Sequence, residues 1–458
     1  MSDKRQKNQL VLAFGDESRS EAPRVSGEGT ESLAAKCRTE SPALGEPMRE
    51  EVCEQENCKR AWQRVKANRG SPGVDGMTVQ ELPGFLQQHW PAIGEQLLGG
   101  TYPPQPVRRK EIDKPDGGVR KLGIPTVLDR FIQQAVMQVL QKRWDGTFSE
   151  HSYGFRPGRS AHQAVKAAQE YIAAGYRWVV DLDLEKFFDR VSHDQLMAKI
   201  AERVSDPRLR KLIRAFLRAG VLEGGRVSPV DEGTPQGGPL SPLLSNIVLD
   251  EFDRELEQRG HRFARYADDS NIYVRSRRAG ERVMKSLTRF ISAKLKLQVN
   301  QQKSAVARPW ERKFLGFSFP SSASPKRRIA PKAVKRFKER IRELTSRTRG
   351  ISIERMAQEL APYLRGWIGY FGKCETPSVL QSLEEWTRRR LRSAIWKQWK
   401  RGKVRFAVLR KRGVDTRLAA QTAGSAQGPW RLANSPALAI ALPNAYFDSL
   451  GIPRLTVR

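Results

Sequence analysis

Two adjacent acids, Asp268 and Asp269, follow Tyr266 and Ala267 between two strand-like runs. The run Phe-Ala-Arg precedes the four residues and Ser-Asn-Ile-Tyr-Val ends the segment, so the pattern predicts a strand, a tight turn and a second strand. A pair of carboxylates at the tip of such a hairpin is a place to bind magnesium. Because a chain of this length can contain the tetrapeptide by chance, its meaning depends on a second acidic strand.

A second acidic strand follows the apolar run Trp-Val-Val and contains Asp181 and Asp183. Alternation along a strand places both side chains on one face, and Asp181 could equally be structural. Two strands that end in acids can share two Mg²⁺ ions, which activate an attacking hydroxyl and stabilise a leaving phosphate oxygen. We expect Asp183 and Asp268 to be ligands, with the Leu184 carbonyl as a further ligand and Asp269 in support. Mn²⁺ is a possible substitute.

A third segment is rich in glycine and proline and reads Gly-Thr-Pro-Gln-Gly-Gly-Pro-Leu-Ser-Pro over residues 233–242. Gly237 and Gly238 remove side chains where a nucleotide or a duplex could approach closely. Gln236 offers an amide that can read a base or sugar edge. Taken alone, the segment could also be an ordinary Gly/Pro loop. Residues 243–252 then predict a buried helix.

The charge of the chain points to a polyanionic partner. The 458 residues carry a formal net charge of +32, although residues 1–56 hold twelve acids against eight bases. Such a field predicts salt-sensitive binding of nucleic acids. A membrane-surface protein could share this charge, but the apolar run at 436–442 is too short to span a bilayer, and the N-terminus lacks a signal-peptide core. We therefore expect a cytoplasmic protein with no membrane partner.

The four cysteines are irregularly spaced, which argues for reduced thiols and against a disulfide framework. Neither Cys nor His follows Cys374. A C-terminal zinc-binding module is therefore excluded by residue count.

Composition divides the chain into regions. Residues 1–55 are rich in Glu, Ser, Gly and Pro, and we expect them to form a disordered leader. From residue 107 to about 320, helical and strand-like segments alternate in an α+β pattern. From residue 331 the pattern becomes helical. One apolar stripe at i, i+3, i+7 and i+10 marks an otherwise basic helix, and consists of Val334, Phe337, Ile341 and Leu344. Further helices are predicted at 354–371 and 379–400.

Taken together, these segments resemble the palm of a reverse transcriptase. The motifs, in chain order, are DLDLEKFF at 181–188, TPQGGPLSP at 234–242, YADD at 266–269, NQQKS at 300–304 and FLGF at 314–317. The upstream segments resemble in particular the group II intron-encoded reverse transcriptase and maturase family, and lie at 61–79, 114–130 and 151–164.

The resemblance implies an α+β right-hand polymerase, with fingers and palm at 56–320. An all-α three-helix thumb, also called the maturase domain, would follow at 321–400, and a short basic nucleic-acid-binding tail at 401–458. The tail resembles that of the bacterial class associated with group IIC introns. The resemblance does not include the family's endonuclease domain.

The resemblance also assigns roles to nucleotide-binding residues. It implies metal binding by Asp183, Asp268 and Asp269. Phe188 would be the aromatic gate that excludes a ribose 2′-hydroxyl and so selects dNTPs, although one of Phe187 and Phe188 could be a core residue. Lys114 and Arg120 flank the turn Pro-Asp-Gly-Gly and would close over the triphosphate, which Arg can grip bidentately. Gln236 would complete this group.

Two further motifs receive roles from the same resemblance. Lys303 would protonate the departing pyrophosphate. Phe314, Leu315 and Gly316 resemble the primer grip, where a glycine lets the backbone approach the primer. The resemblance also implies that Gly237 and Gly238 contact the primer and the template. As bare sequence, the segment at 314–317 reads equally well as a buried strand.

The helical region is strongly basic. Residues 326–349 hold eleven bases and two acids, and residues 386–412 hold twelve bases and no acid, interleaved with tryptophans. This density on amphipathic helices favours phosphate contact. In the family, the region holds the template–primer duplex and the intron RNA.

The leading hypothesis is an RNA-directed DNA polymerase that also binds group II intron RNA as a splicing maturase and supports retromobility. Its partners would be an RNA template with a DNA or RNA primer, dNTPs and a DNA target. One alternative is an RNA-binding maturase with vestigial polymerase activity, although paired metal ligands serve no purpose in RNA binding alone. Another is a domesticated or free-standing reverse transcriptase in DNA repair or defence.

Overall fold

The computed structural model describes residues 48–113, 118–322 and 324–456. Its internal contacts divide the chain into two units. The first contains the described residues up to Ala164, then Val180–Ile272 and Arg278–Ala305. The second contains Val165–Val179, Tyr273–Arg277 and the described residues from Val306 onward.

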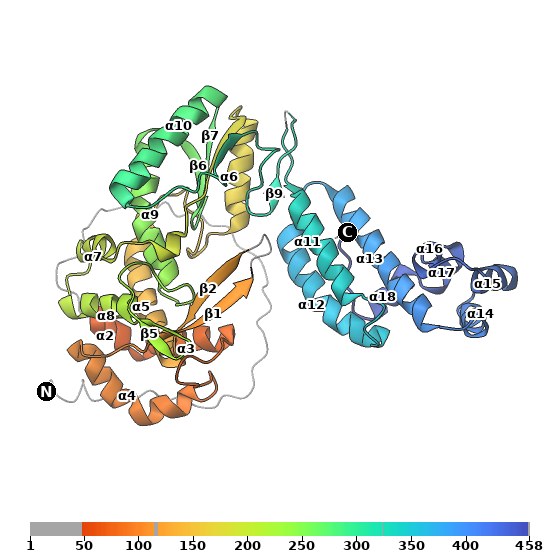
Figure 1. The fold of residues 1–458 in the computed structure, drawn as a ribbon, viewed down its shortest axis with the longest axis horizontal. Helices are drawn as coiled ribbons and strands as arrows, with labels where there is room; N and C mark the ends of the chain where they lie inside the picture. Colours follow the sequence, from red (N-terminus) through yellow and green to blue (C-terminus); the bar gives the residue numbers. More distant parts are fainter. Residues whose placement is uncertain (1–47, 114–117, 323, 457–458) are drawn as a thin grey trace, which may run out of the picture. The chain divides into compact units, whose positions relative to one another are not determined.

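The first unit begins with helices that pack on a long central helix. The helices here are α2 (Met48–Cys53), α3 (Gln55–Asn68), α4 (Leu82–Gly99), α5 (Val127–Trp144) and α6 (Ala161–Ala173), the last of which continues into the second unit. Helices α2 and α3 both contact α5, which can be followed in Figure 1. Helix α5 starts where the Thr126 side chain accepts a hydrogen bond from the Asp129 amide, as an N-cap does.

Ordered structure begins before the end of the disordered leader that was predicted for residues 1–55. Helix α2 occupies Met48–Cys53, and the side chains of Met48, Val52 and Cys53 are buried. Six residues have little helical stability alone, so the helix depends on this burial against α5. Residues 1–47 lie outside the described part of the chain.

Two four-stranded sheets position the site. The first has the strand order β2-β1-β4-β5. Its strands are β1 (Val107–Asp113), β2 (Val119–Ile124), β4 (Val221–Glu223) and β5 (Arg226–Ser228). The second has the order β6-β7-β3-β8 and places β3 next to β7. Its strands are β3 (Trp178–Leu182), β6 (Arg262–Tyr266), β7 (Asp269–Val274) and β8 (Ala305–Ala307).

Helices pack around these sheets. They are α7 (His193–Ala201), α8 (Pro207–Arg218), α9 (Ser241–Gln258) and α10 (Arg277–Phe290), and α10 runs into a π-helical turn at Ile291–Leu295. Helix α9 contacts α5, α7 and β6, so it links the helices of the first unit to the hairpin that carries the acidic turn. Its side chains are buried along most of its length, as the sequence predicts.

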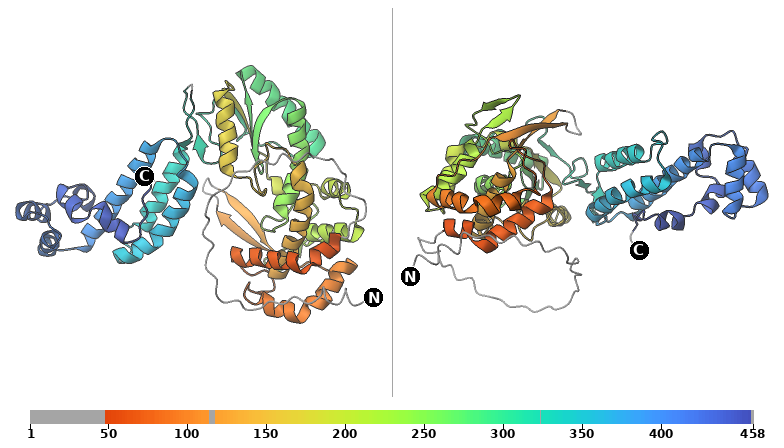
Figure 2. Two further views of the ribbon diagram at one scale, coloured as in Figure 1. Left: turned by 180° about the vertical axis from the view of Figure 1, so that it is seen from behind. Right: turned by 90° about the horizontal axis from the view of Figure 1, so that it is seen from below.

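The second unit is mainly helical. Its main helices are α11 (Pro331–Leu344), α12 (Ile353–Phe371) and α13 (Pro377–Gln398), which run side by side in Figure 2. The expected apolar stripe is confirmed, because Phe337, Ile341 and Leu344 are buried and Val334 packs against them. A short two-stranded sheet precedes these helices and consists of β9 (Phe317–Ser318) and β10 (Arg328–Ile329).

The internal contacts divide the chain at other positions than the predicted boundaries of 320 and 400. The second unit already includes residues from Val306. After residue 400 the chain forms short helices that share its core, namely α14 (Gly402–Lys411), α15 (Thr416–Ala423), α16 (Pro429–Leu432), α17 (Pro436–Ala441) and α18 (Asn444–Ser449). Buried Arg388 reaches Asp448 at 2.8 Å, and Glu384 accepts hydrogen bonds from the amides of Leu455 and Thr456. The segment after 400 is therefore packed on α13.

Candidate nucleotidyl-transfer site

The acidic turn joins β6 to β7 through two residues, Ala267 and Asp268. Ala267 has a φ of 58°, the left-handed conformation that side chains other than glycine rarely adopt. The opposing backbone comes so close that a Cβ on Gly154 would stand 2.3 Å from the Ala267 nitrogen. Glycine is therefore required at 154. The turn is held in an uncommon conformation that points to a functional role.

Asp183 follows β3, and hydrogen bonds from the neighbouring segment 298–304 hold its backbone in place. The Asn300 amide donates to the Asp183 carbonyl at 2.8 Å, and the Asp183 amide donates to Ser304 Oγ at 3.0 Å. The Asn300 side chain in turn accepts from the amides of Gln302 and Lys303, which closes the loop on itself. As a result, Lys303 Nζ lies 3.5 Å from Asp183 Oδ2.

Asp183 and Asp268 open into one cavity of about 1510 Å³. Its described lining also includes Leu184, Arg120, Phe188, Gln236 and Lys303. Burial raises the pKa of Asp268, and the negative charge of Asp183 raises it further, whereas Arg120 and Arg265 oppose the increase. The two carboxylates are therefore close enough to repel each other, which a bound cation would relieve.

The donor set fits a divalent cation that prefers oxygen ligands. It consists of two carboxylates in one cavity, which Leu184 also lines. Within the described residues, no group of three or more His, Cys, Asp or Glu side chains is placed to hold a metal ion. Asp269 begins β7, is half-buried and is not among the described lining residues of the cavity.

Asp181 makes a contact within the sheet. It lies within β3, and the Asn271 amide on β7 donates to Asp181 Oδ1 at 3.0 Å in the orientation that satisfies both groups. This contact links the neighbouring strands that carry Asp183 and Asp268.

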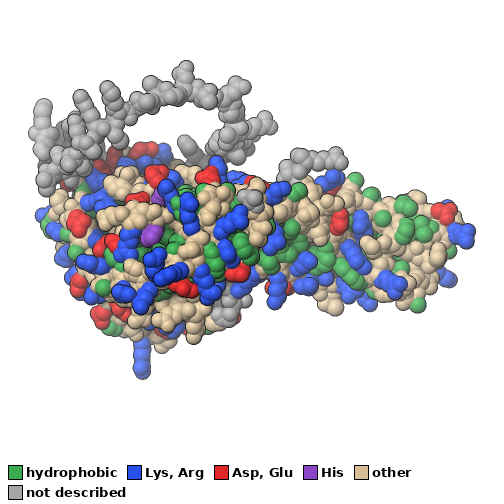
Figure 3. Space-filling view, turned by 90° about the horizontal axis from the view of Figure 1, so that it is seen from above, with side chains coloured by type: hydrophobic (Ala, Val, Ile, Leu, Met, Phe, Trp, Pro, Cys, Tyr) green, Lys and Arg blue, Asp and Glu red, His purple; other side chains and the backbone are tan. Residues whose placement is uncertain are grey.

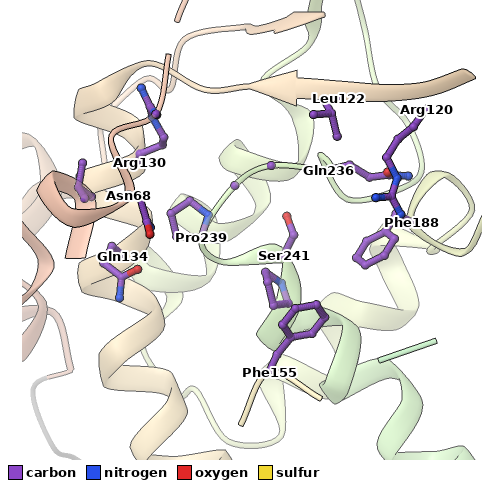
Figure 4. Close-up of a pocket in the computed structure, with 15 residues that line it drawn as sticks. Asn68, Arg120, Leu122, Arg130, Gln134, Phe155, Phe188, Gln236, Pro239 and Ser241 are labelled. Atoms are coloured by element: carbon purple, nitrogen blue, oxygen red, sulfur yellow. The ribbon is translucent and has the colours of Figure 1, made fainter. Parts of the chain in front are cut away.

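A second cavity of about 500 Å³ adjoins the first and shares Arg120, Phe188 and Gln236 with it. Figure 4 shows the Arg120 guanidinium over the Phe188 ring, with the Gln236 side chain beside them. Phe187 is buried and packs edge-on against Phe188 at 5.2 Å, so Phe187 is the core residue of the pair. Phe188 is the ring that faces the cavities.

The glycine-rich loop bridges β2 and the Phe188 segment. The Gly123 amide donates to the Gln236 carbonyl at 2.9 Å, and the Thr234 amide donates to the Phe188 carbonyl at 2.6 Å. A Cβ on Gly237 would lie 2.6 Å from the Gly123 oxygen, and one on Gly238 would lie 2.4 Å from Gln133 Oε1. Glycine is therefore needed for packing at 237, where the neighbouring atom belongs to the backbone, whereas at 238 the neighbour is the end of a flexible side chain.

The segment 314–317 forms a hairpin in the second unit. Phe314 and Phe317 exchange two backbone hydrogen bonds of 2.8 and 2.9 Å, and both turn residues, Leu315 and Gly316, have positive φ values. The Tyr370 hydroxyl on α12 donates to the Leu315 carbonyl at 2.8 Å. Phe314 is buried.

Lys114, which the sequence assigns to the triphosphate, lies outside the described residues. Other lining residues were not singled out from the sequence, namely Asn68, Arg130, Gln134, Phe155 and Ser241. Three of them, Asn68, Arg130 and Phe155, lie in the upstream segments that carried the family resemblance, but the resemblance did not single out their side chains. Arg130 donates to the Ser71 carbonyl at 2.6 Å and so fixes the loop after α3.

Comparison with known proteins decides the family. Residues 112–319 match the model of the reverse transcriptase (RNA-dependent DNA polymerase) family, and residues 334–413 match the maturase-specific domain of group II introns. The chain is 34% identical to protein YkfC of Escherichia coli over 274 residues, which cover 52% of this chain and 72% of YkfC. The chain belongs to the reverse transcriptases that carry a group II intron maturase domain. It is therefore an RNA-directed DNA polymerase by family.

Other similarities are more partial. This reverse transcriptase is 39% identical to the group II intron-encoded protein LtrA of Lactococcus lactis subsp. cremoris over 206 residues, which span 45% of this chain and about a third of LtrA (34%). Among solved structures, a partial Cas6-RT-Cas1–Cas2 complex matches 54% of this chain and 42% of its own chain, with 28% identity and a TM-score of 0.35.

The surface of the reverse transcriptase is rich in Lys and Arg, as Figure 3 shows for one face. In the described part of the chain, no helix is both long and apolar enough to cross a membrane.

Proposed function

We propose that this reverse transcriptase extends a primer on an RNA template with two Mg²⁺ ions held by Asp183 and Asp268. The observation that carries the proposal is the shared cavity, which brings both carboxylates together with Arg120, Phe188 and Gln236. Asp269 and the Leu184 carbonyl would complete the coordination. When bound, the ions would activate the primer hydroxyl and offset negative charge on the phosphates. Mn²⁺ would substitute.

The side chains around the carboxylates would bind and select the nucleotide. Arg120, together with Lys114, would grip the triphosphate. The Phe188 ring lies under Arg120 in Figure 4, where it would meet the 2′-hydroxyl of an rNTP. Gln236 would contact the base or sugar edge, and Lys303 would donate a proton to the departing pyrophosphate.

The second unit would act as the thumb and maturase domain of a right-hand polymerase. In support, α11 and α13 present a cluster of bases around Trp386, with Lys338, Arg342 and Arg390 each within 5.7 Å of its ring centroid. Such a surface suits the phosphates of a template–primer duplex or an intron RNA. The hairpin at 314–317 would contact the primer.

The biological role that we propose is maturation and mobility of a group IIC-like intron. The maturase-specific domain and the similarity to LtrA support binding of intron RNA, and the basic segment after 400 would contact a DNA target. We further propose that the protein works in the cytoplasm.

Primer extension tests the site assignment. The Asp268→Ala protein, given an RNA template, a DNA primer, dNTPs and Mg²⁺, should extend no primer, whereas the parent protein should extend it fully. Undiminished extension by the variant would refute the assignment. Splicing of the intron RNA by the same variant separates the activities, because survival of splicing would place RNA folding on a surface distinct from the carboxylates.

A further inference from the structure

The side chain of Arg265 is completely buried beneath the acidic turn. Its partner Asp253 on α9 is buried equally, with both side chains 0% exposed. Nε and one Nη of Arg265 donate to the two oxygens of Asp253 at 2.7 and 2.5 Å, which is a bidentate pair.

Every N–H group of this guanidinium has an acceptor. Besides Asp253, the acceptors are Ser152 Oγ at 2.7 Å, Asn246 Oδ1 at 3.0 Å and the Ala267 carbonyl at 2.8 Å. An arginine has five such donors in a fixed planar fork, so this group is satisfied in only one orientation. The network therefore joins β6, α9 and the segment 151–154 to the turn.

The same segments also contact the turn and its flanking strand directly. The side-chain amide of Asn246 donates to the Gly154 carbonyl at 2.9 Å, and Gly154 packs against the Ala267 nitrogen. The backbone amide of Arg265 donates to the His151 carbonyl at 2.9 Å, and the Tyr153 amide donates to the Arg265 carbonyl at 2.9 Å. The residue next to Asp268 is thus fixed by hydrogen bonds and by contact.

Stability alone is a weak explanation for this arrangement. A buried ion pair loses hydration on both charges, and apolar replacements of similar volume are often neutral or stabilising. In contrast, the hydrogen bond to the Ala267 carbonyl acts on a residue in a left-handed conformation, which costs on the order of 1–2 kcal/mol for alanine. Something must hold the turn in that conformation, and Arg265 donates directly to its carbonyl.

We propose that Arg265 is a positioning residue for DNA synthesis. By holding the Ala267 carbonyl, it fixes the turn so that the Asp268 carboxylate faces the cavity it shares with Asp183. The inference rests on the proposed metal-binding role of those two acids. Removal of the contact should leave the nucleotide pocket in place and should weaken binding of the metal ions, with slower turnover.

The decisive variant replaces the buried pair with apolar residues. The double variant Arg265→Met, Asp253→Leu removes both charges together, so it should fold with an unfolding midpoint close to that of the parent protein. It lacks the donor to Ala267. We expect its kcat to fall at least tenfold and its half-saturating Mg²⁺ concentration to rise severalfold, with little change in the KM for dNTP. Misplacement of a reacting group by about 1 Å is enough for such a loss.

Two companion variants separate positioning from packing. Ser152→Ala removes one hydrogen bond from the same guanidinium and leaves the Ala267 contact, so its kcat and Mg²⁺ dependence should change far less than those of the double variant. Ala267→Gly, added to the double variant, should restore kcat severalfold because glycine adopts the left-handed turn without a clamp. If Arg265 served only global stability, glycine at the turn would restore nothing.

Parent-like kcat and Mg²⁺ dependence in the double variant would overturn the inference. The inference would also be overturned if the losses of kcat in the double variant and in Ser152→Ala simply followed the drop in unfolding midpoint. If the double variant fails to fold, Arg265→Lys with and without Ala267→Gly provides the same comparison. A different result would refute the proposed function itself, namely primer extension by the Asp268→Ala protein.

Discussion

Lys303 Nζ lies 3.5 Å from Asp183 Oδ2, although 120 positions separate the two residues in the chain. The proximity follows from the backbone, since Asn300 and Ser304 both hydrogen-bond to Asp183. The NQQKS segment therefore places a cation beside the acid that would hold a metal. The Lys303 side chain remains 65% exposed, so the pair adds little to stability.

Replacement of Lys303 by Met should slow nucleotide addition with little effect on folding. The loss of a general acid typically lowers a rate by about 10²–10⁴-fold. Single-turnover primer extension with saturating dNTP measures this step directly, and the unfolding midpoint should correspond to a change of less than about 1 kcal/mol. Lys303→Arg keeps the charge and serves as the control for electrostatics. Parent-like single-turnover rates for the Met variant would remove Lys303 from the mechanism.

Replacement of Phe188 by Val should relax the choice between dNTP and rNTP. The ring faces the cavity beside Arg120, and a smaller side chain would leave room for a 2′-hydroxyl. We expect the ratio of kcat/KM for dNTP over rNTP to fall at least tenfold in steady-state incorporation assays. The matched control is Phe187→Leu, which should lose about 1–2 kcal/mol of stability because that ring is buried, but should keep the parent's discrimination. A change of discrimination in the control alone would reverse the two roles.

The sequence predicted that Asp183 and Asp268 would each follow a strand, and the structure confirms this, because both strands are short and strongly patterned. Asp183 and Asp268 meet because β3 and β7 are neighbours in one sheet. The family resemblance assigned the gate to Phe188, but the residue pattern alone could not choose between Phe187 and Phe188, because the chain there forms a 3₁₀ turn, Phe187–Asp189, in which strand alternation no longer applies.

Other features depended on contacts between distant segments. Arg265 reads as an ordinary charged residue in a strand, and its partners lie between 2 and 113 positions away. Helix α2 was missed because its six residues are stabilised by burial against α5 and not by their own helical preference. Packing of the segment after 400 onto α13 likewise involves side chains such as Arg388 and Asp448, 60 positions apart.

Replacement of Gly237 by Ala should damage both folding and polymerisation. The backbone has a φ of 137°, and a Cβ would meet the Gly123 carbonyl oxygen at 2.6 Å, where no flexible side chain can yield. We expect a loss of about 2 kcal/mol or more in chemical denaturation, together with loss of primer extension. Gly366→Ala is the control, since that glycine lies within α12 with no atom within 4 Å of the added Cβ. It should gain about 0.5–1 kcal/mol. Equal stability of the two variants would contradict the packing role of Gly237.

Replacement of Asp268 by Asn should abolish DNA synthesis and yet stabilise the metal-free protein at neutral pH. Burial and the Asp183 charge raise the pKa of Asp268 in the folded state above its value in the unfolded chain, about 3.9. Between these two pKa values the folded protein binds more protons than the unfolded chain, so the stability of the parent falls as pH rises through that window. The amide carries no charge and escapes this loss.

The stability difference between the two proteins therefore depends on pH with a definite sign. The Asn variant should be more stable at all pH values above the raised pKa, and its advantage should shrink as pH falls and vanish below about pH 3.9. Urea unfolding in EDTA at several pH values measures the difference. Asp181→Asn is the control within the same sheet, because Asp181 accepts a hydrogen bond from Asn271. In the parent, Mg²⁺ should remove the penalty by offsetting the two negative charges, so added Mg²⁺ should raise the unfolding midpoint of the parent more than that of the Asn variant. An Asn variant that is less stable than the parent at neutral pH in EDTA would show that the carboxylates do not repel each other in the folded protein.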